Sequence, residues 1–558
     1  MDSAAPKDEG STWDVVVVGG GPVGCAVGLE LRRHGVRCLV IEKDAVTPRY
    51  PVKAMLLNPR TLEFMRRWGI ADDIRAAATT PEGWRKGVTF ATSLTGKDLG
   101  HFRDGFDFRA SEEGDDVSEG AQVIMQPDTL RVMRAALLES GATYRDGVTV
   151  DEVVDGPDGV VVTMTDQATG GVSTLHAAYV VGADGPQSIV RSTAGIQRSG
   201  RGGIAANLLL HFRVEGLLDE AGPTPAAFTS LTSPAGSALV VPIDRETWCA
   251  HVAGHPVDVD VDKLDVEAIV RRIIGADRPF EVVYAGAYKI HERIADEYRA
   301  GRLFIAGDAA HLYAPFGGHN MNSGFGDAVN LGWKLGAVVN GWADDSLLDT
   351  YGPERRPIAV TNATEASSNV ARFVGAARGI IEEMTGTDVD APGVEAEARR
   401  RGWGDRLWQG TKLQYVARGI TLDQRYVSAA VADDDGDVAP WTSMTYTPSA
   451  KPGHRLPHVW LEDGSSLYDH LAPGLTLLAA PSASVSAERF RQAAVAAGTP
   501  LEILEINDLA LRVKCGAPLV LVRPDQHVAW RGHGVEDADA VLAVATARTV
   551  STGVSGAA

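Results

Sequence analysis

Cysteine is scarce in this sequence of 558 residues, which contains only Cys25, Cys38, Cys249 and Cys515. None of the four stands in a CxxC pair, so the sequence predicts neither a disulfide framework nor a metal cluster. Because unpaired cysteines of this kind are typical of reducing compartments, we expect the protein to be cytoplasmic.

Long apolar runs and positive charge are also in short supply. No stretch approaches the roughly 20 apolar residues needed to span a bilayer, and residues 1–12 are polar and lack the apolar core of a signal peptide. The formal net charge is −20, from 53 basic and 73 acidic side chains. The sequence therefore predicts no membrane partner and no nucleic-acid partner.

The rest of the composition is that of a globular protein. Apolar residues make up 44% of the chain and charged residues 23%, which is ordinary for a folded domain. A chain of this length exceeds what one hydrophobic core usually supports, so we expect two or three domains.

A glycine-rich turn follows the first apolar run of the chain. The predicted strand from Trp13 leads into the GxGxxG of Gly19, Gly21 and Gly24, then into an amphipathic helix and a second apolar strand that ends at Glu42. Such a unit binds dinucleotides: the glycines admit a pyrophosphate, and the acid meets the adenosine ribose. The residues expected at this end of the ligand are Gly19, Gly21, Pro22, Val23, Gly24, Glu42 and Lys43.

A second ligand-binding pattern occupies residues 301–335. A short apolar strand ends at Asp308, where a carboxylate can accept hydrogen bonds from ligand hydroxyls. Gly317 and Gly318 then allow the backbone to approach a flat ligand, and a helix with an apolar face begins at Asn320. The start of that helix favours negative charge.

These two patterns resemble the FAD motifs of the group A flavoprotein aromatic hydroxylases, the family of para-hydroxybenzoate and phenol hydroxylases and of many polyketide-tailoring oxygenases. The resemblance implies that Asp308 binds the ribityl chain and that the helix start at Met321 and Asn322 faces N1 and the C2 carbonyl of the flavin. The usual Gly-Gln-Gly of the family is Gly-His-Asn at residues 318–320. His319 is either a source of positive potential or a plain surface substitution.

Three further positions match the family, and each also has an ordinary structural interpretation. Lys53 stands where an arginine is common, but could face solvent; Gln126 matches a flavin-contacting glutamine, but could merely begin a helix. Asp184, in an Ala-Asp-Gly motif that serves the FAD pyrophosphate region and NAD(P)H use in the family, could simply cap a helix. Beyond the N-terminal unit, the resemblance assigns to FAD the residues Lys53, Gln126, Asp184, Asp308, Pro315, Gly318, Asn320, Met321 and Asn322.

The resemblance implies an α/β fold: a Rossmann-like FAD-binding domain, an inserted β-rich substrate domain and a C-terminal thioredoxin-like domain. Within the insertion, residues 112–119 are acidic and predict a solvated loop. We expect an FAD domain of residues 13–85, 120–198 and 290–375, a substrate domain of 86–119 and 199–289, a helical region and linker of 376–450, and a thioredoxin-like domain of 451–552.

The C-terminal unit has the order strand, helix, strand, two strands and helix from residue 475 onward. Where a redox thioredoxin carries cysteines, residues 481–484 read Pro-Ser-Ala-Ser, so CxxC chemistry is excluded there. A role in stability or in a homodimer contact is the remaining expectation.

The β-rich insertion offers several polar and aromatic side chains but no clear catalytic base. A phenol with a pKa of about 10 needs a base or a relay at neutral pH. The candidates are His211, Arg213, Arg245, Trp248, His251, Tyr284 and Tyr288.

The resemblance implies a flavin monooxygenase that uses FAD, NAD(P)H and O₂ to hydroxylate a phenolic or polycyclic, polyketide-like aromatic substrate through a flavin C4a-hydroperoxide. The lack of a second GxGxxG fits transient docking of NAD(P)H. Baeyer–Villiger oxidation or epoxidation on the same scaffold stays open, as does a non-catalytic flavin-containing sensor of aromatic ligands. A flavin halogenase is disfavoured, because the sequence lacks Trp-x-Trp-x-Ile-Pro.

Overall fold

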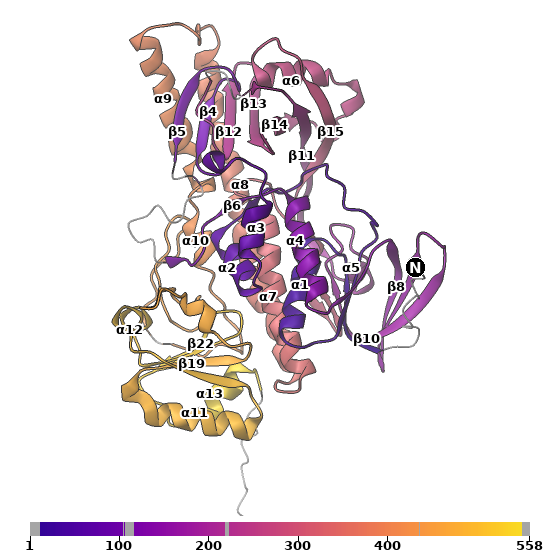
Figure 1. Ribbon diagram of the computed structural model, residues 1–558, viewed down its shortest axis with the longest axis vertical. Helices are drawn as coiled ribbons and strands as arrows, with labels where there is room; N and C mark the ends of the chain where they lie inside the picture. Colours follow the sequence, from indigo (N-terminus) through magenta and orange to yellow (C-terminus); the bar gives the residue numbers. More distant parts are fainter. Residues whose placement is uncertain (1–11, 104, 106–115, 218–221, 435, 549–558) are drawn as a thin grey trace, which may run out of the picture.

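The computed structural model describes residues 12–103, 105, 116–217, 222–434 and 436–548. Three bodies are arranged around a central group of helices (Figure 1). A sheet with β4, β12 and β15 lies at the top. The helices α1, α4 and α7 lie in the middle, beside the sheet that contains β8 and β10, and the C-terminal unit lies at the lower left. The first part of the acidic loop, residues 112–115, falls outside the described residues.

The first sheet is parallel at its centre, where β1, β2, β10 and β17 pair side by side. Its strands are valine-rich and buried, as expected for strands covered on both faces. The strand order is β16 (Arg299–Ala300), β17 (Leu303–Ile305), β10 (Val172–Gly182), β1 (Thr12–Val18), β2 (Cys38–Ile41) and β7 (Thr143–Arg145), with β9 (Gly159–Asp166) between β10 and β8 (Val148–Gly156).

Helices pack closely against this sheet because glycine replaces larger side chains at the contact. A Cβ added to Gly28 of α1 would lie 2.7 Å from Leu137 Cδ1 of α4 and 3.1 Å from Val40 of β2. The helices of this region are α1 (Pro22–Arg33), α2 (Pro59–Arg67), α3 (Ala71–Ala77), α4 (Gln126–Glu139), α5 (Ile189–Thr193) and α7 (His319–Val339), and the short strands β3 (Leu56–Leu57) and β6 (Gln122–Val123) pair beside them.

The second sheet is mostly antiparallel, with one parallel pair between β12 and β4. It confirms the β-rich character predicted for this part of the chain, and α6 (Val266–Ile274) and α9 (Val394–Thr411) lie beside it (Figure 1). Its order is β18 (His311–Leu312), β15 (Glu281–Ala295), β11 (Arg198–Arg213), β14 (Thr247–His255), β13 (Gly236–Pro242), β12 (Phe228–Ser233), β4 (Val88–Ala91) and β5 (Asp98–Phe102).

One long helix, α8 (Tyr351–Met384), connects the middle of the molecule to the second sheet (Figure 1). The sequence predicts two helices here, divided before Pro357, and that division is wrong. Pro357 lies inside α8 near its N-terminus, where the missing N–H removes a single backbone hydrogen bond and the helix continues.

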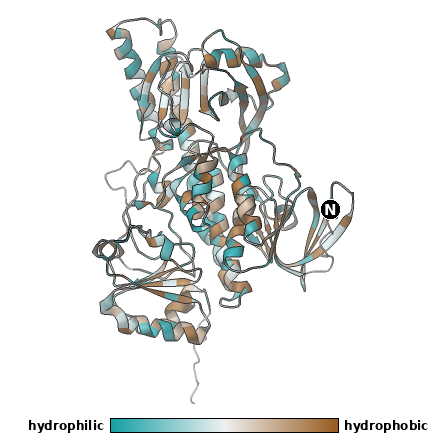
Figure 2. Cartoon of the chain, viewed as in Figure 1, coloured by the Kyte–Doolittle hydropathy of each residue, from teal (hydrophilic) through white to brown (hydrophobic). Residues whose placement is uncertain are grey.

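The C-terminal unit has the strand and helix order that the sequence predicts, with one helix more, α12, between β20 and β21. β19 (Leu475–Ala479) pairs parallel with β20 (Leu501–Glu505) and antiparallel with β21 (Leu519–Val522), which pairs with β22 (Val528–Gly532). Figure 2 shows many hydrophilic residues on α11 of this unit, and likewise on α9, which lies beside the second sheet. The helices of this unit are α11 (Ser484–Ala497), α12 (Leu509–Cys515) and α13 (Ala538–Ala545).

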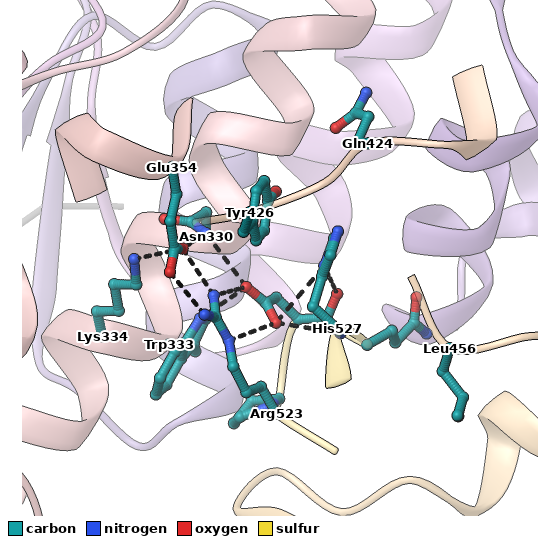
Figure 3. Close-up of polar contacts among 12 residues, drawn as sticks. Asn330, Trp333, Lys334, Glu354, Gln424, Tyr426, Leu456, Arg523 and His527 are labelled. Carbon is teal, nitrogen blue, oxygen red and sulfur yellow. Dashed lines mark hydrogen bonds and ion pairs between the residues drawn. The ribbon is translucent and has the colours of Figure 1, made fainter. Parts of the chain in front are cut away.

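A buried polar cluster joins the C-terminal unit to α7 and α8 (Figure 3). Arg523 donates to both carboxylate oxygens of Glu354, at 2.6 and 2.7 Å, and Lys334 Nζ lies 2.7 Å from the same carboxylate. Asp525 accepts hydrogen bonds from Trp333 Nε1 at 3.1 Å and from Asn330 Nδ2 at 3.2 Å. Because each charge is paired, this contact can exclude water without leaving an isolated ion.

The described end of the acidic loop, residues 116–119, is buried, so the prediction of a solvated loop is wrong there. Asp116 pairs with Arg418 at 2.7 Å, and Glu119 pairs with Arg66 at 3.0 Å and with Arg75 at 2.5 Å. These arginines neutralise the acids, which is the condition under which a carboxylate is tolerated inside a protein.

Within the described ranges, no helix has both the length and the apolar character required to cross a membrane.

Candidate active site

The register of the first sheet brings distant motifs to one edge. Gly19, Glu42, Asp184 and Asp308 each follow a different parallel strand, within three residues of its last paired position. The strands end side by side, so these four positions share the carboxyl edge of the sheet, where open α/β sheets bind ligands. The paired residues next to that edge are Val18 with Ile41, Val18 with Gly182, and Gly182 with Ile305.

The glycines of the first turn have different functions. Gly19 has a φ of 100°, and a Cβ on Gly24 would lie 1.8 Å from Gly19 O, so both are required by the turn itself. A Cβ on Gly21 would meet no protein atom within 4 Å. Gly21 therefore leaves open space in front of the start of α1, as a phosphate site requires.

The other predicted residues at this end lie around the same turn. Glu42 accepts hydrogen bonds from Gly20 N at 2.7 Å and Asp44 N at 3.0 Å, which fix its carboxylate at the mouth of the turn. Lys43 is exposed next to it, and Pro22 is the buried first residue of α1. Val23 packs on the short 3₁₀ turn η5 (Gly307–Ala309) and on α7. Cβ atoms added to Gly307 and Gly324 would lie 2.9 and 2.5 Å from the Val23 side chain.

Asp184 binds the start of a helix and retains a free oxygen. Its Oδ2 accepts from Ile189 N, the first amide of α5, at 2.8 Å, whereas the N-cap residue of that helix is Ser188. Its Oδ1 is buried and has no hydrogen-bond partner, and burial raises the pKa of the carboxyl. A buried unpaired oxygen at this edge is a position where a ligand could bind.

Asp308 lies in a short 3₁₀ turn, η5 (Gly307–Ala309), directly after β17. Its Oδ1 accepts from Asn320 Nδ2 at 2.7 Å, and the residue is exposed at the edge of the first sheet. Desolvation by the surrounding protein nevertheless raises the pKa of the carboxyl, against the opposing effects of His311 and the Asn320 hydrogen bond.

The start of α7 presents free backbone amides. Gly318 precedes it with a φ of 66°, and no side chain caps the helix, so the first N–H groups have no partner inside it. The side chain of Asn322 accepts from Asn58 N at 3.0 Å and Thr61 Oγ1 at 2.7 Å, which ties α7 to α2. The amides of the helix start, rather than the Asn322 side chain, are thus available to a ligand.

His319 matches neither interpretation proposed from the sequence. It is buried, with 6% of its surface exposed, so it is not a surface substitution. Burial lowers the pKa of its imidazole to about 4, so the ring is neutral and adds no positive charge in the protein alone. Its Nε2 is buried without a hydrogen-bond partner.

A cavity of about 200 Å³ separates this edge from the second sheet. Of the residues predicted to bind FAD, five line it, namely Lys53, Pro315, Gly318, Asn320 and Met321. The other eleven do not: Gly19, Gly21, Pro22, Val23, Gly24, Glu42, Lys43, Gln126, Asp184, Asp308 and Asn322. The remaining lining is largely apolar and comes from the second sheet, the segment that ends in β3, the residues around the start of α7, α8 and the turn after α9: Ala54, Met55, Leu56, Asn207, Phe228, Ser230, Ser237, Ala238, Leu239, His251, Ala253, Tyr288, Phe316, Gly317, His319, Phe373, Gln414 and Tyr415.

A chain of three polar side chains crosses the sheet wall of the cavity. Asn207 Nδ2 donates to Tyr288 Oη at 3.1 Å, and Tyr288 Oη lies 3.1 Å from His251 Nδ1. Burial lowers the pKa of His251 to about 4 and raises the pKa of Tyr288 to about 12. At neutral pH the imidazole is therefore uncharged and the phenol keeps its proton.

Only two of the seven candidates for contact with substrate line this cavity, namely His251 and Tyr288. His211 is buried behind the wall, where its Nε2 accepts from Val52 N at 3.3 Å. Asn207 was not predicted; the available signal was an amide inside the apolar run of β11, where a polar side chain needs a partner. The candidates that do not line the cavity are His211, Arg213, Arg245, Trp248 and Tyr284.

Comparison with known proteins identifies this architecture. The family model described as "FAD binding domain" matches residues 12–366, and the model described as "Aromatic-ring hydroxylase, C-terminal" matches residues 449–552. Together they cover both the edge of the first sheet and the C-terminal unit.

Individual relatives agree along nearly the whole chain. An FAD-dependent monooxygenase of Emericella nidulans is 30% identical over 97% of this chain and 91% of its own length. Among solved structures, the substrate-free rebeccamycin biosynthetic enzyme RebC has a TM-score of 0.84 at 30% identity, covering 97% of this chain and 99% of that one. Aklavinone-11 hydroxylase, solved with FAD and aklavinone, has a TM-score of 0.81 at 27% identity, covering 96% and 99%. The chain belongs to the FAD-dependent aromatic-ring hydroxylases, a family of flavoprotein monooxygenases.

Proposed function

We propose that this chain hydroxylates a phenolic, polycyclic aromatic substrate inside the cavity between the two sheets. One observation carries the proposal: the cavity is lined both by five of the predicted FAD residues, at and near the α7 start, and by the Asn207–Tyr288–His251 chain of the second sheet. Apolar side chains such as Phe228 and Phe373 in this lining suit a flat ring system. The similarity to aklavinone-11 hydroxylase, which was solved with aklavinone, supports a polycyclic substrate.

The residues at the sheet edge would hold FAD at both ends. Glu42 lies where the adenosine ribose would bind, Gly21 leaves room for the pyrophosphate, and Asp308 would meet the ribityl chain. The free amides of α7 would stabilise negative charge on the flavin ring. When bound, FAD supplies the redox chemistry: it accepts electrons from NAD(P)H and transfers one oxygen atom from O₂ to the ring.

The polar chain gives the substrate a path for its proton. Tyr288 Oη accepts a hydrogen bond from Asn207, so its own proton is free to point toward His251 Nδ1. A substrate phenol that donates to Tyr288 could then lose its proton to the imidazole through the tyrosine. The phenolate formed in the cavity would supply the negative charge that a buried imidazolium needs.

A group of arginines next to Asp308 offers a docking place for NAD(P)H. Arg191 donates to Pro186 O and Ala309 O at 3.3 Å, and Arg198 donates to Pro186 O at 2.7 Å. Burial and then the charges of its neighbours, including Arg293, lower the pKa of Arg198. A dinucleotide pyrophosphate would relieve this repulsion.

The proposal is tested by a screen of phenols and polycyclic quinones with the FAD-loaded protein. We expect at least one phenol to accelerate NAD(P)H oxidation and to yield a product that mass spectrometry identifies as the hydroxylated ring. Lactone or epoxide products would instead establish Baeyer–Villiger or epoxidation chemistry, and a flavin spectral change without NAD(P)H consumption would establish a sensor.

We also propose a cytoplasmic location, which the four free and buried cysteines support.

A further inference from the structure

A buried histidine behind the α7 start has both ring nitrogens occupied. His311 is fully buried, with Nε2 2.8 Å from Asp327 Oδ2 and Nδ1 3.0 Å from Asn320 Oδ1. Burial alone would raise the pKa of Asp327, but His311 and Arg355, whose Nε lies 2.8 Å away, lower it overall. Asp327 is therefore a carboxylate, which can only accept a hydrogen bond from His311.

The other face of Asn320 meets the acid predicted to bind the ribityl chain. Its Nδ2 donates to Asp308 Oδ1 at 2.7 Å, while its Oδ1 faces His311. An amide oxygen only accepts hydrogen bonds, so both nitrogens of His311 must donate in this arrangement. The imidazole is then an imidazolium, and the Asp308 oxygen that accepts from Asn320 carries no proton.

Rotating the amide by half a turn reverses these roles without changing the number of protons. The NH₂ group then faces His311 Nδ1, which must have lost its proton, and the amide oxygen faces Asp308, which must carry one. In both arrangements the pair formed by His311 and Asp308 holds one shared proton. Asn320 thereby links the protonation of a buried imidazole to that of an acid at the cleft.

We propose that Asn320 is a positioning residue that couples Asp308 to the His311–Asp327 pair and orients its carboxyl group, so that Oδ2 stays available to a ribityl hydroxyl. The inference rests on FAD binding, not on the choice of substrate. Asn320 stands where the aromatic hydroxylases usually have glycine, which has no side chain to form such a bridge, so the device distinguishes this chain.

Other charged and titratable groups lie around the bridge. Tyr313 stacks on the His311 ring, with centroids 4.8 Å apart. The groups that act on Asp308 or Asp327 from neighbouring elements are Lys53, Arg198, Tyr298, Tyr313, Tyr351 and Arg355.

The coupling is tested by calorimetric titration of FAD into the apoprotein in two buffers of different ionisation enthalpy. In the wild type we expect no net proton uptake or release on binding and a dissociation constant that stays constant across the neutral pH range. In Asn320→Ala we expect binding about tenfold weaker, as for loss of one hydrogen bond to a charged group, together with net proton exchange that makes it pH-dependent.

Two further variants keep the test decisive. Asn320→Asp retains the shape and the acceptor for His311 but places a second carboxylate beside Asp308, so its FAD binding should weaken as the pH rises. Asn340→Ala is the matched control at the other end of α7, where the asparagine donates to His34 O and Gly336 O, and it should bind FAD like the wild type.

Equal affinities and equal proton counts for wild type, Asn320→Ala and Asn320→Asp would overturn the coupling. That result would leave the proposed hydroxylation intact. Conversely, an FAD-loaded wild type that oxidises no phenol would refute the hydroxylation but not the bridge.

Discussion

Tyr288 is the side chain on which the proposed proton path depends. Tyr288→Phe should lower the rate of phenol hydroxylation by about 100-fold at neutral pH, because the substrate loses its link to His251. The deficit should shrink as the pH approaches about 10, where a phenol ionises without help. Stopped-flow measurement of the hydroxylation step across pH checks this expectation.

Tyr284→Phe is the control for that variant. Tyr284 lies on the same strand, β15, but does not line the cavity. Its substitution should leave the rate and its pH dependence unchanged. A Tyr288→Phe enzyme with the wild-type pH profile would remove Tyr288 from the proton path.

Asp308 tests the ribityl end of the FAD site. Asp308→Ala should raise the dissociation constant of FAD about 10- to 100-fold, as expected when hydrogen bonds to a charged group are lost. Fluorescence titration of the colourless apoprotein with FAD measures this.

Glu42→Ala should weaken binding through the adenosine end, and a variant of either acid that still purifies with full FAD occupancy would contradict its assignment.

Sequence reasoning predicted the acids that lie at the edge of the first sheet but not the polar chain of the cavity. Glu42 and Asp308 were predictable because each follows a short apolar strand at a recognisable spacing. The contact between Tyr288 and His251 depends on the register of three long strands, in which Asn207 pairs with Tyr288 and Leu209 with His251. No local pattern specifies such a register between distant segments.

The glycines of the turn before α1 have different functions. Gly19 and Gly24 are required by the turn itself, whereas Gly21 is required by the proposed pyrophosphate site. Gly24→Ala would place a Cβ 1.8 Å from Gly19 O, so it should lower the thermal stability of the apoprotein as well as FAD binding. Gly21→Ala adds a Cβ in open space, so the apoprotein should melt like the wild type while FAD binds more weakly.

Thermal unfolding of both apoproteins, followed by FAD titration, distinguishes the two glycines. If Gly21→Ala bound FAD as tightly as the wild type, the pyrophosphate could not lie in front of this turn. If Gly24→Ala were as stable as the wild type, the close backbone approach at Gly24 would not be required.

Elements whose boundaries depend on distant contacts were predicted less well. A proline usually ends a helix, yet α8 continues through Pro357 because the helix is held by packing along most of its length. Likewise, Asp116 and Glu119 look solvated in sequence, and only the arginines that reach them from other segments explain their burial.

The attachment of the C-terminal unit depends on Arg523. This fully buried side chain pairs with Glu354 of α8 across the contact and with Asp525 of its own unit, so Arg523→Ala would leave two buried carboxylates with Lys334 as the cation that remains beside Glu354. We expect a loss of about 3–5 kcal/mol in the free energy of unfolding, measured by chemical denaturation.

The matched control for Arg523 is Arg213→Ala. Arg213 pairs with Glu246 on the surface, and its substitution should leave stability unchanged. A stable Arg523→Ala protein would mean that the other contacts of the C-terminal unit hold it in place without this arginine.

The central claim is that an aromatic ring in the cavity receives one atom of O₂ for each NAD(P)H oxidised. The most direct measurement is mass spectrometry of the product formed by the FAD-loaded protein under isotopically heavy O₂, together with the amount of NAD(P)H consumed. The account predicts one heavy oxygen in a hydroxylated phenolic product per NAD(P)H. A protein that binds FAD and reduces O₂ with NAD(P)H, yet places no heavy oxygen in any aromatic substrate, would contradict it.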